Sequence, residues 1–174
     1  MNERRDFLKK SALLTGGLIM GTTKMSAGNN YKSKRPSKAK RNFTSPVIED
    51  TIKKVKSAID DPELAWMFEN CFPNTLDTTV NFQMKNGRPD TFVITGDIEA
   101  MWLRDSSAQV HHYLPFANDD ENLKKLIAGV INRQAQSILI DPYPNAFNRK
   151  PTGSHWETDY TYMIPELHER EWEI

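Results

Sequence analysis

Apolar residues recur at helical spacing in the stretch that follows Pro46. One face of this stretch carries Val47, Ile48, Ile52, Val55 and Ile59. Ser45 is placed to cap the helix, and Pro46 suits a first helical turn, where an amide hydrogen would have no partner. The pattern predicts a helix over residues 46–59.

Two further stretches show the same periodicity. A helix is predicted from about Glu63, with an inner stripe of Leu64, Met67, Phe68 and Cys71. Cys71 is the chain's only cysteine and is interpreted as a small buried apolar residue. The longest helix is predicted over residues 118–140, where Asn118 and Glu121 have the spacing of a capping box. Its apolar stripe consists of Leu123, Leu126, Ile127, Val130, Ile131 and Ile138.

The segment between these helices starts with a short β-branched run. "TFVIT", residues 91–95, is predicted to be a strand or extended segment that ends at Gly96. The following residues, Gly96–Leu114, fit one amphipathic helix. Four helices and at most one short strand, before the helix over residues 96–114, predict an all-α fold class.

Charged residues lie on a face of the predicted 96–114 helix that is not plainly polar. The stripe expected to pack consists of Ala100, Leu103, Ser107, Val110 and Leu114. A second stripe consists of Met101, Arg104, Asp105, Ala108, His111 and His112. Asp97 lies in line with this second stripe at the helix start. Taken singly, these residues fit an N-cap, surface charges and a core tryptophan. Together, Asp97, Trp102, Arg104 and Asp105 suggest a concave sugar site, because an aromatic face packs on C–H groups while charged groups bond to hydroxyls.

A long loop and the histidines supply the remaining candidates. Residues 141–159 are rich in proline, glycine and asparagine and are predicted to form a loop, where Asn145 and His155 are weaker candidates for substrate binding. Turn chemistry for Asn145 and a solvated loop position for His155 are the alternatives. Adjacent histidines on a helix point about 100° apart, so no metal site is expected, and no cofactor motif is present in the sequence.

The first part of the chain differs in composition from the rest. Residues 1–54 hold 13 Lys and Arg against 4 Asp and Glu, whereas the remainder holds 10 against 19. Residues 1–28 resemble a twin-arginine export signal, with Arg4 and Arg5 before an apolar run too short to be a permanent membrane span. Residues 29–44 are interpreted as a basic disordered linker. We therefore expect export to the periplasm or the extracellular space, with the twin-arginine translocase as a transient partner and no nucleic-acid partner.

A family resemblance follows from several of these stretches. "TFVITGDIEAMWLRDSSAQVHHYLP" resembles the signature of glycoside hydrolase family 125, metal-independent exo-acting α-1,6-mannosidases. Further similar stretches are "NTLDTT", "LIAGVINRQ", "IDPYPNAFN" and the final "EREWEI". Small departures occur at His168, where the family usually has an aromatic residue, and at Glu171, where it usually has lysine.

The resemblance implies a fold and a reaction. It implies that residues 45–174 are the first part of an (α/α)6 barrel. It also implies that the protein is an inverting enzyme that releases terminal mannose from a glycan. In such an enzyme one carboxylic acid protonates the leaving oxygen and another activates water. Both family carboxylates would lie beyond Ile174, so no catalytic residue is assigned within residues 1–174 and this stretch alone is expected to be inactive. Asp97, Trp102, Arg104 and Asp105 match the motif that lines the family's sugar pocket.

Two alternatives remain at this point. The 174 residues could be a non-catalytic exported carbohydrate-binding protein or an inert helical product with uncovered apolar faces. The protein could also be another (α/α)6 glycosidase or a polysaccharide lyase, which a different saccharide profile would reveal.

Overall fold

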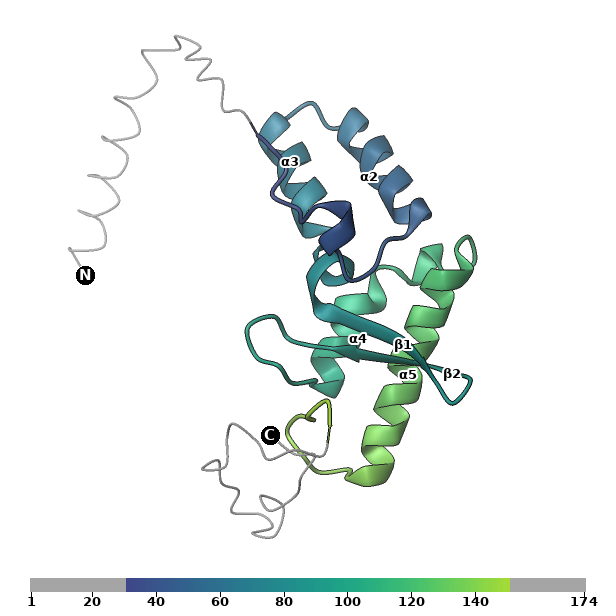
Figure 1. Ribbon diagram of the computed structural model, residues 1–174. Coiled ribbons are helices and arrows are strands. Elements are labelled where there is room, and N and C mark those ends of the chain that lie inside the picture. The colour runs from purple at the N-terminus through teal and green to yellow at the C-terminus, as the bar shows by residue number, and fades with distance from the viewer. Residues whose placement is uncertain (1–30, 151–174) are drawn as a thin grey trace, which may run out of the picture. The chain divides into compact units, whose positions relative to one another are not determined.

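The computed structural model describes residues 31–150, which apart from Tyr31 belong to one unit that begins at Lys32 (Figure 1). This part of the chain is mostly helical and contains a small two-stranded sheet. Its elements in chain order are η1 (Lys38–Lys40), α2 (Pro46–Ala58), α3 (Pro62–Cys71), η2 (Thr75–Thr79), β1 (Val80–Lys85), β2 (Arg88–Val93), α4 (Leu103–His111), η3 (Leu114–Phe116) and α5 (Glu121–Ile140). The predicted export signal, residues 1–28, lies outside the described residues.

The starts of α2 and α5 are capped and joined to each other. Ser45 accepts a hydrogen bond from the Ile48 amide, which confirms the predicted cap, and its hydroxyl donates to Asp120 Oδ2 over 2.6 Å. The other oxygen of Asp120 accepts from the amides of Asn122 and Leu123. The predicted capping residue of α5, Asn118, is therefore wrong by two positions, because Asp120 is the residue that reaches the free amides.

A β-hairpin stands where at most one short strand was expected. β1 and β2 are antiparallel, with pairs running from Val80↔Val93 to Lys85↔Arg88, and Asn86 and Gly87 form the connecting turn with φ of 51° and 76°. Left-handed φ at both turn residues is the condition for the tightest hairpin turn, which Asn-Gly satisfies. The all-α prediction is therefore wrong in this detail, although the described chain is mainly helical.

β2 packs directly on α5, and Figure 1 shows the two crossing. Thr91 donates a hydrogen bond from its hydroxyl to the Leu126 carbonyl over 2.8 Å. A Cβ built on Gly129 of α5 would lie 2.3 Å from Thr91 Oγ1, so only glycine allows this approach. The close contact places β2 in the centre of the core, where Phe92 and Val93 are buried.

The buried face of α5 differs in part from the predicted stripe. Leu123, Leu126, Ile127 and Val130 are buried as expected, but Ile131 and Ile138 are 61% and 48% exposed. Arg133 and Ser137 take the inner positions of the second half instead. Arg133 is tolerated there because its guanidinium forms two hydrogen bonds with buried Asp90, at 2.7 and 2.5 Å.

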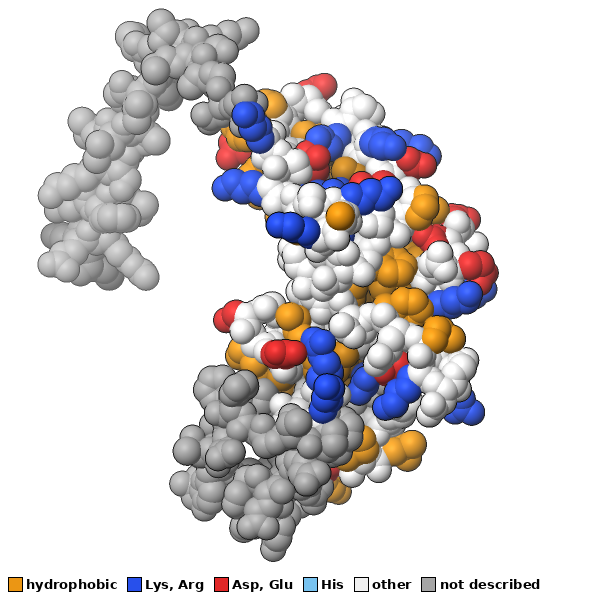
Figure 2. Space-filling view, viewed as in Figure 1, with side chains coloured by type: hydrophobic (Ala, Val, Ile, Leu, Met, Phe, Trp, Pro, Cys, Tyr) orange, Lys and Arg blue, Asp and Glu red, His pale blue; other side chains and the backbone are white. Residues whose placement is uncertain are grey.

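The inner face of α3 was also predicted imperfectly. Ala65 is buried and Phe68 packs on the core, whereas Leu64, Met67 and Cys71 are exposed. The prediction that Cys71 is buried is therefore wrong. Figure 2 shows apolar side chains reaching the surface. Among residues 31–150, the large ones that are exposed are Leu64, Met67, Met84, Leu114, Ile131, Ile138, Leu139, Ile140 and Tyr143.

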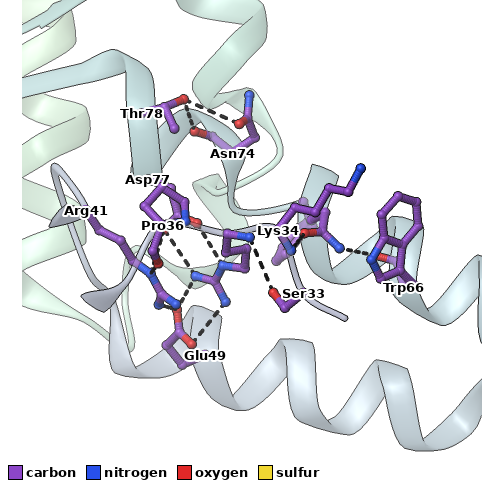
Figure 3. A network of polar contacts seen from close by, with 12 residues as sticks. Ser33, Lys34, Pro36, Arg41, Glu49, Trp66, Asn74, Asp77 and Thr78 are labelled. Carbon is purple, nitrogen blue, oxygen red and sulfur yellow. Dashed lines mark hydrogen bonds and ion pairs between the residues drawn. The ribbon is translucent and has the colours of Figure 1, made fainter. Parts of the chain in front are cut away.

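The basic segment is ordered over residues 31–44, so the prediction of a disordered linker is wrong there. Arg35 bonds to Asp77 at 2.7 and 3.1 Å and to Glu49 of α2, and Arg41 bonds to Glu49 over 3.0 Å (Figure 3). The amides of Asn42 and Phe43 donate to the carbonyls of Asp77 and Leu76. Buried Asp77 supplies the opposite charge that composition alone did not reveal.

None of the helices among residues 31–150 combines the length and the apolar character that a bilayer crossing requires.

Candidate functional site

The predicted helix over residues 96–114 is helical only in its second half. α4 runs from Leu103 to His111, and residues 96–102 form an irregular segment that begins with Gly96 at φ +128°. Trp102 is extended, with φ −81° and ψ 135°, at the N-cap position. The alignment of Asp97 with the second stripe of α4 is therefore wrong, because no helix connects them.

A backbone bridge explains why the helix starts late. Met101 and Phe147 form an isolated antiparallel pair in which each amide donates to the other residue's carbonyl over 3.0 Å. Both side chains are buried. A helical Met101 would give up these two bonds to a segment 46 positions away in sequence, which periodicity within the helix cannot anticipate.

A second contact holds the same two loops together. Glu99 forms an ion pair with Arg149 over 3.3 Å, and the Arg149 guanidinium lies 5.3 Å from the centre of the Phe92 ring. The loop that carries Asn145 is thereby fixed beside the segment that carries Asp97 and Trp102. Sequence reasoning missed Glu99 and Arg149, because nothing in their spacing indicates a long-range pair.

The predicted site residues lie in different settings within this loop pair and the helix that follows. Asp97 and Asn145 are exposed, and Trp102 is half-buried. The Arg104 side chain is 88% exposed and lies 3.4 Å from the Asp105 carboxylate, whose side chain is 39% exposed. His155 lies outside the described residues.

The other face of α4 is only partly packed. Of the stripe predicted to be inside, Ala100 and Val110 are buried, whereas Ser107 and Leu114 are exposed. An apolar hollow of about 160 Å³ between α4 and α5 is lined by Ser107, Val110, His111, Leu114, Ile127, Val130, Ile131 and Gln134. The Gln134 amide also donates to the carbonyl of Leu103 and to Ser106 and Ser107, so it connects α5 to the first turns of α4.

The carboxyl end of α4 is anchored in the core through the residues that follow it. Tyr113 is fully buried and donates its hydroxyl to the Phe72 carbonyl over 2.5 Å, and its burial raises the pKa of the phenol. His112 contacts the same carbonyl through Nε2 at 3.3 Å, and burial lowers the pKa of its imidazole. α4 is thus fixed at both ends while Arg104 and Asp105 project outward.

These side chains are of the types that bind sugar hydroxyls, although no hollow described within residues 31–150 is lined by them. The exposed carboxylates of Asp97 and Asp105 can accept hydrogen bonds from hydroxyl groups, the Arg104 guanidinium can donate, and the Trp102 ring offers an apolar surface. No group of three or more His, Cys, Asp or Glu side chains within residues 31–150 is arranged to hold a metal ion.

Comparison with known proteins identifies relatives over the larger part of the chain. The family model described as metal-independent α-mannosidase (GH125) matches residues 61–174. The "Meiotically up-regulated gene 157 protein" of Schizosaccharomyces pombe is 48% identical over 114 residues, which is 65% of this chain and 22% of that protein.

A solved structure is similar as well. It is a Streptococcus pneumoniae protein from a study of metal-independent α-mannosidases, in a non-productive complex with α-1,6-mannobiose. The TM-score is 0.57 at 41% identity, covering 65% of this chain and 26% of that one. The chain therefore spans about a quarter or less of the length of these relatives, and its match to the family model shows that it belongs to glycoside hydrolase family 125, the metal-independent α-mannosidases.

Proposed function

We propose that the full-length protein is an inverting exo-α-1,6-mannosidase that releases terminal mannose from glycans without a metal ion. The observation that carries the proposal is the family match over residues 61–174, supported by the similar structure in complex with α-1,6-mannobiose. The same match covers the loop pair and α4, so the outward-facing polar groups belong to the segment that the family shares.

Within this function, Asp97, Trp102, Arg104 and Asp105 bind or organise the mannose, and Asn145 and His155 contribute from the following loop. The bridge between Met101 and Phe147 supports the inclusion of Asn145, because it holds the two loops side by side. A sugar bound there would accept from Arg104 and donate to the carboxylates, with one ring face on Trp102.

The reaction itself needs two further carboxylic groups. The family resemblance puts the general acid and the general base outside residues 1–174, and inverting hydrolysis requires both, roughly 6.5–9.5 Å apart with water between them. We therefore propose that residues 1–174 alone do not hydrolyse glycosides. The (α/α)6 barrel belongs to the same proposal for the whole protein.

The test is an assay of the full-length protein on α-1,6-, α-1,2- and α-1,3-linked mannobiose, with and without a chelator. We expect release from the α-1,6-linked disaccharide only, unaffected by the chelator, and β-mannose as the first product by NMR. Absence of release would end the proposal, loss of activity with chelator would end its metal-free part, and α-mannose as the first product would end inversion.

A non-catalytic role of the 174 residues is the competing function, and the exposed apolar side chains of α3 and α5 weigh against it because they favour association over a soluble monomer. Cooperative thermal unfolding of residues 1–174 together with calorimetric binding of mannose would support the competing role. Polysaccharide lyase activity of the full-length protein would support the third possibility.

Export is a separate proposal. The twin-arginine pair and apolar run of residues 1–28 support a periplasmic or extracellular location. Cell fractionation tests it: replacement of Arg4 and Arg5 by lysine would retain the protein in the cytoplasm, whereas unchanged export would refute the twin-arginine route.

A further inference from the structure

The turn end of the hairpin formed by β1 and β2 places two cations directly opposite each other. Lys85 and Arg88 are paired residues in the antiparallel register and flank the Asn86-Gly87 turn. Like charges at directly opposite positions destabilise a hairpin, since their side chains project from the same face about 5 Å apart at Cβ. Their juxtaposition therefore costs the hairpin a small amount of stability.

That face is turned toward α5. Positions two residues apart along a strand share a face, so Lys85 and Arg88 lie on the side of Gln83 and Asp90. Asp90 on this side is buried and bonds to Arg133 of α5. The two cations therefore border the body of the protein, which distinguishes them from lysines that only keep a strand edge soluble.

The carboxylate on the same face of the hairpin, that of Asp90, is not available to neutralise them. Asp90 accepts from Arg133 at both oxygens and also from the Gln83 amide over 2.9 Å. Its charge balances Arg133, which leaves the charges of Lys85 and Arg88 without an opposite partner. Among residues 31–150, neither cation takes part in an ion pair.

A hollow opens at this point. It has a volume of about 520 Å³ and is lined by Lys85, Asn86, Arg88, Pro89, Asp90 and Gln136. The volume lies within the range of small-molecule sites. Besides the two cations, Asn86 and Gln136 bring side-chain amides that can donate hydrogen bonds.

We propose that this hollow binds a tetrahedral oxyanion, a phosphate or sulfate group either free or carried as an ester on a sugar. Two cations and two amide donors around a hollow match the charge and the acceptor oxygens of such a group. A bound oxyanion also relieves the repulsion between Lys85 and Arg88. The site lies at the turn end of the hairpin, whereas the loop with Asp97 and Trp102 follows the opposite end of β2, so it is separate from the proposed mannose site.

The test is calorimetric titration of the full-length protein with inorganic phosphate, sulfate, mannose 6-phosphate and mannose. We expect saturable binding of the anions that weakens with salt, and no binding of mannose at this site. Lys85→Gln and Arg88→Gln should each weaken anion binding about tenfold or more, as expected for the loss of one charged hydrogen bond. Lys54→Gln, which removes an exposed charge on α2, is the matched control and should leave anion binding unchanged.

Each remaining outcome decides the question. Tighter binding of mannose 6-phosphate than of phosphate, lost in the Lys85→Gln and Arg88→Gln variants, identifies an ester on a sugar as the ligand of this hollow, and equal affinities identify the oxyanion alone. Absence of saturable anion binding, or anion binding by the Lys85→Gln and Arg88→Gln variants that is as tight as that of the parent protein, overturns the proposal. The experiment measures binding of an anion and not hydrolysis. Absence of anion binding therefore does not contradict the proposed mannosidase activity, and absence of mannosidase activity does not contradict the proposed anion site.

Discussion

Replacement of Gly129 by alanine tests the packing of α5 on β2. A Cβ at this position would lie 2.3 Å from Thr91 Oγ1, 3.0 Å from the Thr91 nitrogen and 3.1 Å from the Asp90 carbonyl carbon. Two of these three neighbours are backbone atoms of a buried strand, so a side-chain rotation cannot remove the whole overlap. α5 and β2 must separate, and the hydrogen bond from Thr91 to the Leu126 carbonyl is stretched.

The expected cost can be worked from opposing terms. Alanine within a helix is favoured over glycine by about 1 kcal/mol. Overpacking of a filled core costs about 1–3 kcal/mol, and a lost buried hydrogen bond adds about 1 kcal/mol. We expect Gly129→Ala to lower the free energy of unfolding of the full-length protein by about 1–3 kcal/mol, measured by urea denaturation.

A pair of variants at the facing position separates the clash from other effects. In the Gly129→Ala background, Thr91→Ala removes the atom that lies nearest the new methyl group and should recover part of the loss. Thr91→Val keeps a γ-branch of the same shape and should recover none of it. If Gly129→Ala is as stable as the parent, or if both double variants behave alike, the close approach of α5 and β2 is not what requires glycine.

Three other changes test the remaining parts of the structure. Asp90→Ala leaves Arg133 as a buried unpaired charge and should cost about 3–5 kcal/mol in urea denaturation, with partial recovery on Arg133→Met; a loss below 1 kcal/mol would contradict burial of the pair. Burial alone would raise the pKa of Glu49, but its hydrogen bonds and ion pairs with arginines lower that pKa. The carboxylate therefore stabilises the folded protein fully above its ordinary pKa of 4.5, and this stabilisation is lost as the pH falls through the lower folded-state pKa. Glu49→Gln should flatten the stability profile in that acidic range, and an unchanged slope would refute the assignment. Arg104→Ala should leave stability within about 0.5 kcal/mol of the parent but weaken mannobiose binding about tenfold or more, whereas equal binding would remove Arg104 from the site.

Elements whose formation depends on neighbouring residues were predictable from the sequence. α2 and α3 begin where Ser45, Asp61 and the following prolines place them, since caps and prolines act within one turn. The hairpin was not predicted although "KNGR" carries its turn, because β1, with the sequence VNFQMK, holds a single β-branched residue and does not stand out as a strand.

The candidate site was predictable in composition and not in geometry. The charged cluster after Gly96 was recognisable from residue types, but its loop conformation depends on Phe147 and Arg149, which lie on a different segment. A helical wheel assumes that every residue of the window is helical. It therefore cannot show that the backbone of Met101 forms its hydrogen bonds with Phe147 and not within a helix. Asp97 and Arg104 are consequently joined by an irregular segment, and the bridge between Met101 and Phe147 fixes the conformation of that segment.

The basic segment shows how a composition rule fails when charges are matched at long range. A segment rich in lysine and arginine stays disordered when nothing offsets the entropy of ordering it. Here Arg35 reaches Asp77, 42 positions away, in a site where its side chain is 6% exposed and that of Asp77 is 2% exposed. Burial of the Asp77 carboxylate without this partner would be strongly unfavourable. The η2 region therefore depends on the basic segment for a counter-charge, and the basic segment depends on η2 for its ordered position. Residues 32–44 therefore belong to the folded unit, and a boundary drawn from composition at residue 45 would remove the counter-charge of its buried aspartate.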